Sequence, residues 1–305
     1  MRDAATRLVY ETVKKDSRVL ALTADNRNEI FDMIRLEYPE NYIEYGIAEE
    51  NMIASAAGLA SCGKIPFLYT ITNFMSMHAF EFIRNDVCIP NMNVKFLGRS
   101  SGLTSSSMGP THQGTEELAL LRTLPNMLTI TPASPIEARE ATRFAYEHKG
   151  PVYIRLEARG EKEIFSENYS FIPGKGSVIR KGEDLTVIAM GSIICEALKA
   201  AEILSTQNIS LQVINMPMVR PIDSELIMTA ARETKCIITY EEHSVYGGLG
   251  SAVSEVLAMN SSGCKFAMMG LECCASGCGN RQDMREINKI SCNDLISKVR
   301  EMLSL

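Results

Sequence analysis

The sequence predicts an α/β protein built from two doubly wound domains of unequal size, a larger one with a parallel sheet and a smaller one with a mixed sheet. Short apolar strand patterns alternate with amphipathic helix patterns along most of the chain. One polar, turn-rich stretch at residues 157–183 interrupts the alternation and has the length of a linker between domains. The 305 residues suffice for one large or two ordinary domains, and 46% of them are apolar, enough for two cores.

The first domain is expected to cover residues 1–175. Its strand patterns are apolar runs separated by helix patterns, so the strands are expected to run parallel with helices on both faces. The predicted strands are 19–25, 42–45, 65–71, 93–98, 127–132 and 152–156. The predicted helices are 3–15, 28–37, 48–61, 74–88, 115–123 and 135–148, with a Gly/Ser-rich loop at 102–114.

The second domain is expected to cover residues 176–305, where a new series of strand and helix patterns begins at Asp184. The predicted strands are 185–190, 211–216, 236–240 and 265–271. The predicted helices are 193–205, 223–233, 248–259 and 292–303.

Composition excludes several classes of protein. The net charge of -6 argues against the basic surface that nucleic-acid binding requires. The chain contains no apolar run of about 18 residues, the length that spans a bilayer. Residues 1–6 lead directly into a helix pattern and lack the apolar region of a signal peptide. We therefore expect a cytoplasmic protein without nucleic-acid or membrane partners.

The nine cysteines contain no CxxC pair, which favours reduced thiols over disulfides or a metal centre. Cys195 and Cys236 fall in apolar patterns, where a thiol behaves as a small hydrophobe. The cluster of Cys273, Cys274 and Cys278 lacks a nearby histidine, so no metal site is predicted there.

Residues 46–61 place Glu49 at the start of a helix that is rich in Ala, Ser and Gly. A carboxylate in the first turn lies near the partly positive end of the helix. Glu49 and Glu50 would favour a helix start without any further role. With apolar residues around it, however, Glu49 is a candidate for an acid that takes part in chemistry.

Two further features converge with Glu49. Phe74, Met77 and His78 lie in the first turn of the helix that follows strand 65–71, and His112 lies near the end of the loop at residues 105–114. In a parallel α/β sheet the carboxyl ends of the strands form the ligand crevice, and all these residues follow such ends. Singly, Phe74 suits a core and His112 suits a loop; together with a carboxylate they indicate an active site.

The Gly-rich turn at residues 247–250 follows a strand and precedes a helix, the position of a phosphate-binding turn. Its spacing is not GxGxxG, and no acidic residue follows at the required distance. Close packing of strand, turn and helix explains it equally well. A nucleotide-binding module in residues 177–305 therefore remains one alternative function.

Four motifs, in the same order as in the family, resemble the C-terminal half of transketolase. They are residues 46–52 (GIAEENM), 109–113 (GPTHQ), 124–127 (LPNM) and 241–250 (EEHSVYGGLG). The similarity extends over essentially all 305 residues and is closest to the separately encoded C-terminal subunit of split, two-gene transketolases. The resemblance implies a first domain that binds the aminopyrimidine of thiamine diphosphate and a second that is the transketolase C-terminal domain.

The resemblance also implies a partner. In the family, the diphosphate and its divalent metal, Mg²⁺ or Ca²⁺, are bound by a different domain through a Gly-Asp-Gly motif, which this chain lacks. We therefore expect an N-terminal transketolase subunit to supply that domain and the metal ligands, in a heterotetramer with two copies of each subunit. No metal ligand is assigned to the present chain.

The implied activity is the transfer of a two-carbon ketol unit from a ketose to an aldehyde acceptor. By motif position, Glu49 protonates or hydrogen-bonds the pyrimidine ring nitrogen. Phe74 matches the aromatic residue that stacks on the pyrimidine, with Met77 or His78 sharing the wall. His112 matches a histidine that hydrogen-bonds the donor where negative charge develops.

Two departures from the family pattern concern the substrate. Ser107 and Met108 stand where transketolases have Glu-Asp, and a methionine cannot replace the aspartate that reads a sugar hydroxyl. The arginine that holds a sugar phosphate matches Arg159 only with a shift of one residue, and Arg99 is the alternative. We therefore expect a transketolase specialised for an unusual or modified sugar, phosphorylated or free.

Three other hypotheses of function are compatible with the resemblance. The beta subunit of a thiamine-dependent 2-oxoacid dehydrogenase has the same two-domain plan, but residues 109–112 (GPTH) favour transketolase. 1-Deoxyxylulose-phosphate synthase shares short motifs but is one long chain. A non-catalytic assembly subunit would not need Glu49 and His112.

Overall fold

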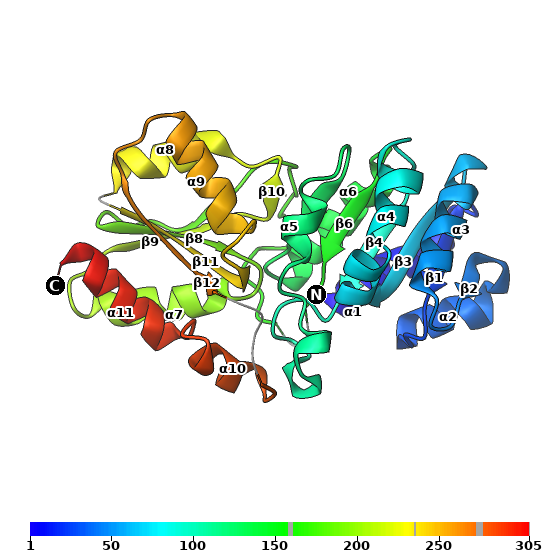
Figure 1. Ribbon diagram of the computed structural model, residues 1–305, viewed down its shortest axis with the longest axis horizontal. Helices are drawn as coiled ribbons and strands as arrows, with labels where there is room; N and C mark the ends of the chain where they lie inside the picture. The colour runs from blue at the N-terminus through cyan, green and yellow to red at the C-terminus, as the bar shows by residue number, and fades with distance from the viewer. Residues whose placement is uncertain (158–160, 235, 273–276, 305) are drawn as a thin grey trace. The chain divides into compact units, whose positions relative to one another are not determined.

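The structure is a computed structural model that describes residues 1–157, 161–234, 236–272 and 277–304. Its chain forms two compact units, each with its own sheet (Figure 1). Unit 1 comprises Met1–Ser101 and Leu120–Phe171, and unit 2 comprises Gly102–Ala119 and Ile172–Leu305. The domain boundary near residue 175 stays a prediction.

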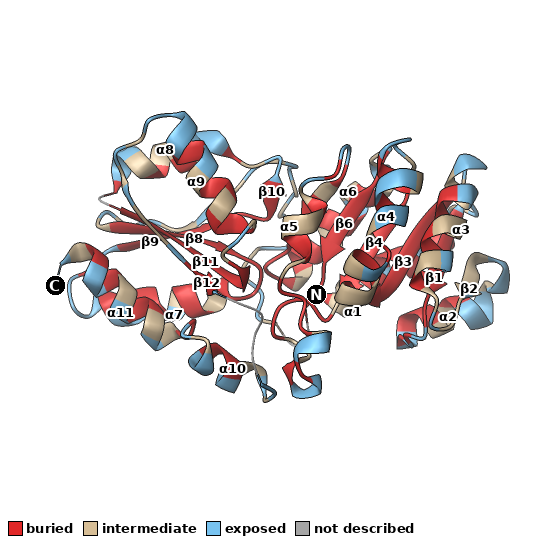
Figure 2. Ribbon diagram, in the orientation of Figure 1, coloured by how far each residue is buried: buried red, intermediate tan, exposed pale blue. Residues whose placement is uncertain are grey.

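Unit 1 contains a sheet in which the strands lie in the order β5-β6-β4-β3-β1-β2, and each neighbouring pair is parallel. Every residue of β1, β3 and β6 is buried. Figure 2 shows that the strand at Leu185–Met190 in the other sheet is buried as well. Helices on both faces cause this burial, which explains why these strands read as continuous apolar runs. The bounds are β1 Val19–Thr23, β2 Tyr42–Glu44, β3 Ile65–Ile71, β4 Lys95–Arg99, β5 Leu128–Ile130 and β6 Val152–Arg155.

The register of the central strands aligns their carboxyl ends. Thr23 at the end of β1 lies opposite Glu44, the last residue of β2, and opposite Tyr69 near the end of β3. The segments that follow these strands therefore leave the sheet at one edge, the edge where ligands bind in parallel α/β sheets.

Two helices of the first part of the chain, α2 and α6, begin at a start signal in the sequence. The Asn28 side chain accepts hydrogen bonds from the amides of Ile30 (2.9 Å) and Phe31 (3.3 Å) at the start of α2, and Pro135 opens α6. The bounds are α1 Arg2–Val13, α2 Glu29–Glu37, α3 Glu49–Ser61, α4 Phe80–Phe82, α5 Glu117–Leu121 and α6 Pro135–Glu147.

The helix predicted at residues 74–88 is not a regular α-helix. It consists of a π-helical turn at Phe74–His78, the short α4, and a second π-helical segment at Ile83–Cys88. The apolar spacing of the sequence predicts a helix but does not distinguish i→i−4 from i→i−5 hydrogen bonds. Such π turns occur frequently at functional sites.

Unit 2 contains the smaller sheet, with strand order β12-β11-β8-β9-β7. β7 pairs antiparallel with β9, and the other pairs are parallel, so the sheet is mixed. The bounds of its strands are β7 Ser177–Arg180, β8 Leu185–Met190, β9 Leu211–Asn215, β11 Cys236–Ser244 and β12 Lys265–Leu271. The short strand β10 (Met218–Arg220) is not part of this sheet. The helix bounds are α7 Ile194–Ser205, α8 Ser224–Glu233, α9 Leu249–Met259, α10 Arg281–Ile287 and α11 Cys292–Leu303.

The predicted α/β class is confirmed, with one mostly parallel sheet and one mixed sheet. Part of the predicted linker nevertheless has defined contacts. Glu163 accepts a hydrogen bond from the amide of Ile136 (2.8 Å), and the hydroxyl of Tyr169 donates to Glu137 (2.8 Å). Among the helices that the structure describes, none combines the length and the apolar character needed to cross a membrane.

Candidate functional site

Glu49 is the first residue of α3 and lies just after the end of β2. The carboxylate of Glu44 accepts hydrogen bonds from the amides of Asp25 (2.8 Å) and Gly46 (3.0 Å), which fixes the turn between β2 and α3. Gly46 has a φ of +65°, a conformation that glycine adopts without strain. This turn places Glu49 at the carboxyl edge of the sheet, as the sequence predicted for the start of its helix.

Glu49 is a buried residue, with only 3% of its surface exposed. Within the described residues, no side chain or amide donates a hydrogen bond to it. Its acceptor oxygens are therefore not engaged by the part of the chain that the structure describes, and a carboxylate in this position is able to accept a hydrogen bond from a ligand.

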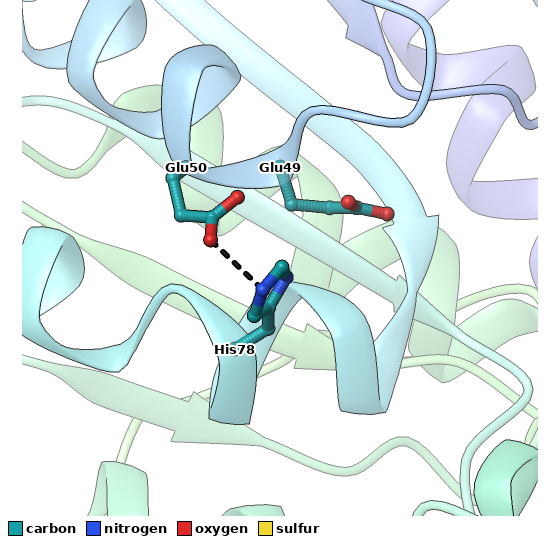
Figure 3. Close-up of side chains that lie close together, drawn as sticks. All are labelled: Glu49, Glu50 and His78. Carbon is teal, nitrogen blue, oxygen red and sulfur yellow. Dashed lines mark ion pairs between the residues drawn. The ribbon is translucent and has the colours of Figure 1, made fainter.

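Glu50 and His78 form an ion pair beside Glu49, with 2.9 Å between His78 Nε2 and Glu50 Oε1. Figure 3 shows the carboxylate of Glu50 aimed at the His78 ring, whereas the Glu49 side chain extends in another direction. One ligand atom from each of the three side chains lies within 4.8 Å of the other two. The absence of a metal ligand from this chain stays a prediction.

The π-helical turn at Phe74–His78 packs against α3. Met75 and Ser76 are buried in it, whereas Phe74 and Met77 are half-buried and His78 is exposed. Phe74, Met77 and His78 therefore retain surface on the segment that borders Glu49. The turn offers an apolar wall and a titratable ring next to a buried carboxylate.

Arg99 lies at the carboxyl end of β4 and is held by a neighbouring loop. Its Nη1 donates to Asn26 Oδ1 (2.7 Å), and the buried Asn26 in turn donates to Thr70 Oγ1 (2.9 Å). Arg155 is fully buried, with its Nη1 3.8 Å from Glu157 Oε1, and so does not reach solvent. Arg159 lies outside the described residues.

The loop that carries His112 belongs to unit 2. It closes through a hydrogen bond from the amide of Gly102 to the carbonyl of Gly114 (2.7 Å) and contains two 3₁₀ turns, Ser106–Met108 and Pro110–His112. His112 is half-buried, and its Nδ1 lies 2.9 Å from Thr111 Oγ1. Met108 is 59% exposed, so its side chain is available to a ligand.

The Gly-rich turn before α9 is not a phosphate site. Glu241 accepts hydrogen bonds from the amides of Leu249 (2.7 Å) and Gly250 (2.8 Å), so a carboxylate of the chain already occupies this helix N-terminus. A Cβ on Gly248 would lie 2.3 Å from Glu241 Oε2, which explains the glycine by close packing.

Sequence reasoning missed the Glu50–His78 pair, the support of Arg99 by Asn26, and a buried ion cluster around Glu242. These contacts join residues far apart in the chain, so no local spacing predicts them. The cluster had one available signal, since residues 241–243 place three polar side chains in succession at the end of an apolar strand.

Comparison with known proteins agrees with this geometry. Residues 1–160 match the family model of the transketolase pyrimidine-binding domain, and residues 174–273 match that of the transketolase C-terminal domain. A protein named as a transketolase C-terminal section, from Methanocaldococcus jannaschii, is 39% identical over 274 residues, covering 89% of this chain and 86% of the relative. The 6-deoxy-6-sulfo-D-fructose transketolase subunit SqwH of Clostridium sp. (strain MSTE9) is 35% identical over 303 residues, covering 99% and 94%.

A solved structure, described as a split gene transketolase in an inactive beta4 tetramer, matches with a TM-score of 0.90 at 37% identity. The match covers 100% of this chain and 98% of that chain. Sequence and fold therefore agree along the whole length, and the chain belongs to the transketolase family, in which it corresponds to the pyrimidine-binding and C-terminal domains.

Proposed function

We propose that this chain is the C-terminal subunit of a thiamine diphosphate-dependent transketolase that transfers a two-carbon ketol unit from a ketose to an aldehyde. A separate N-terminal subunit is proposed to bind the diphosphate and its Mg²⁺ or Ca²⁺, in an assembly with two copies of each chain. The observation that carries the proposal is the buried Glu49 carboxylate at the carboxyl edge of a parallel sheet, in a domain of the pyrimidine-binding family.

When bound, thiamine diphosphate supplies a nucleophilic carbon that holds the transferred two-carbon unit. Glu49 is proposed to hydrogen-bond the ring nitrogen of the pyrimidine and to hold the shared proton at its carboxylate, where burial excludes water. Phe74 and Met77 provide the apolar wall on which the ring packs, and His78 borders it.

His112 is proposed to donate a hydrogen bond to the substrate oxygen on which negative charge develops. Arg99 is proposed to bind an anionic end of the substrate, because the Asn26 contact fixes its guanidinium at the sheet edge. Arg159 remains proposed for the same role. A modified sugar substrate is supported by Met108 and by the name of the Clostridium relative, which specifies a sulfonated fructose.

The decisive experiment combines the purified chain with its N-terminal subunit and compares Glu49→Gln with Glu50→Gln. The two substitutions remove the same charge from adjacent residues of one helix turn, but only Glu49 is buried. We expect Glu49→Gln to lower kcat/KM by about 10²-fold or more and Glu50→Gln to change it by less than about fivefold. Unchanged turnover in the Glu49 variant would refute the assignment.

The same assembly should be assayed with phosphorylated, sulfonated and free ketoses and with 2-oxoacids. Turnover of ketoses with aldehyde acceptors is expected. Turnover of 2-oxoacids alone would instead support the dehydrogenase alternative. A cytoplasmic location is part of the proposal, since free thiols such as those of Cys88 and Cys236 are typical of reducing compartments.

A further inference from the structure

Glu242 is a buried carboxylate at which three separate segments of unit 2 meet. It lies in β11 and is 1% exposed. Its Oε2 accepts hydrogen bonds from the amide of Leu103 (3.2 Å) and from Arg281 Nη2 (2.7 Å), and its Oε1 accepts from Arg285 Nε (2.5 Å). One side chain therefore joins β11, the loop at residues 102–114 and α10.

The loop has further contacts with the segment that leads into α10. The amide of Gly279 donates to the carbonyl of Ser106 (3.3 Å), and Gln113 Nε2 donates to the carbonyl of Gly277 (3.4 Å). These contacts flank His112 on both sides. The loop is thus fixed at its start, its middle and its end by residues of the same unit.

Gly102 makes the Leu103 contact feasible. Its φ is +60°, and a Cβ at this position would lie 2.6 Å from Glu242 Oε2. Only glycine lets the backbone approach the carboxylate so closely in this conformation. The loop start and the ion cluster therefore fit one another sterically as well as electrostatically.

A buried ion cluster is weak evidence for stability, because desolvation of its charges opposes their attraction, whereas loss of one partner leaves a buried charge uncompensated. Arg281 presents its guanidinium through both Nε (2.9 Å to Oε1) and Nη2, a geometry that lysine does not reproduce. Arg285 also contacts Glu196 of α7 (3.4 Å), which ties α10 to the body of the unit. The cluster therefore connects α10 with both β11 and α7.

We propose that Glu242, Arg281 and Arg285 are positioning residues that hold the loop at residues 102–114 in one conformation and so set the place of His112 for the substrate. The inference rests on the proposed function for the role of His112. In this inference, α10 and β11 of unit 2 take part in the reaction indirectly. They hold the loop in place and do not contact the substrate themselves.

The first test measures hydrogen exchange in the assembled enzyme for Arg281→Ala and Arg281→Lys. The Arg281 side chain is 20% exposed, and Arg285 remains to balance Glu242, so the fold is expected to survive. We expect exchange of the amides in residues 103–112 to accelerate about tenfold or more in Arg281→Ala, with partial rescue in Arg281→Lys. Amides of β8 and α11 should be unchanged.

Lys298→Ala is the matched control. It removes a cation from the same unit that has a carboxylate partner, Glu301 at 2.8 Å. Within the described part of the chain, Lys298 forms no hydrogen bond or ion pair with the loop. Exchange in the loop should equal that of the unaltered chain. If Arg281→Ala leaves loop exchange at the level of Lys298→Ala, the inference is wrong.

The second test is a double-mutant cycle with His112→Ala. Arg281→Ala alone is expected to lower kcat/KM for the ketose donor by roughly tenfold to a hundredfold, mostly through KM. In the His112→Ala background it should have little further effect, because the residue acts through His112. Additive losses would overturn the inference.

If His112→Ala itself has no effect on kcat/KM, the proposed role of His112 fails, and the inference falls with it. Accelerated loop exchange would then show only that the cluster holds the loop.

Discussion

At the scale of single residues, Glu242 links charge to stability. Burial by itself would raise the pKa of its carboxyl group, but the charges of Arg281 and Arg285 outweigh burial and hold the pKa below the usual 4.5. The folded pKa is thus lower than the unfolded one. The stabilisation is fully present above about pH 4.5 and is lost as the pH falls toward the folded pKa.

The lowered pKa of Glu242 predicts how Glu242→Gln changes the stability of the chain and its dependence on pH. At neutral pH the variant should be less stable by about 3–5 kcal/mol, because two arginines lose their buried partner. Urea unfolding followed by circular dichroism should also show a shallower loss of stability between about pH 5 and about pH 3 than in the unaltered chain. Identical pH dependence in the two proteins would contradict the argument.

The thiols differ in reactivity for a reason that also lies in single residues. Burial raises the pKa of the Cys88 thiol to about 12, so its reactive thiolate is scarce at neutral pH, whereas Cys62 is exposed. A thiol reagent followed by peptide mass spectrometry should label Cys62 in the native chain and Cys88 only after unfolding. Labelling of Cys88 at the rate of Cys62 would show that the packing around Cys88 opens readily.

At the scale of elements, α3 allows a paired test of backbone conformation. Gly58 lies within the helix, and a Cβ added there would have no neighbouring atom within 4 Å, so Gly58→Ala should stabilise the isolated chain by about 0.5–1 kcal/mol. Gly63 follows the same helix with a φ of +83°, so Gly63→Ala should instead destabilise the chain by roughly 1–2 kcal/mol. Thermal unfolding of the two variants checks both signs. Equal shifts would refute the conformational argument.

The elements also show what sequence can predict. The strands at residues 65–71, 185–190 and 265–271 were predicted with the observed bounds, because each is an apolar run with a clear end. β7 was missed, since this edge strand is only partly buried and its sequence lacks a strong apolar pattern.

The site was predictable only in part, for a physical reason. The position of Glu49 at a helix start follows from local signals, and the structure has it there. The Glu50–His78 contact and the Glu242 cluster depend on packing between segments distant in sequence, which no local period encodes. The catalytic and binding roles of the site residues remain predictions.

At the scale of the whole molecule, exposed apolar side chains near the candidate site bear on assembly. Ile47 is 84% exposed and lies two residues before Glu49. A contiguous apolar patch marks an interaction surface, whereas a single exposed apolar residue is common, so the role of Ile47 needs a direct test. Because the diphosphate-binding domain is proposed to belong to a separate subunit, we expect the isolated chain to be inactive and to gain turnover when the N-terminal subunit is added, as measured by activity during titration with that subunit.

Ile47→Lys tests whether this surface takes part in the assembly. A charged residue at an apolar contact should weaken binding of the N-terminal subunit by about tenfold or more, measured as the subunit concentration that gives half-maximal activity. Activity at saturating partner should recover, because Glu49 itself is unchanged. Met259→Lys is the control, since Met259 is 86% exposed in α9 and is not adjacent to any proposed site residue. If both variants need the same subunit concentration as the unaltered chain for half-maximal activity, Ile47 does not contact the partner. If both variants bind the N-terminal subunit equally weakly, the effect reflects the added charge and not a specific contact.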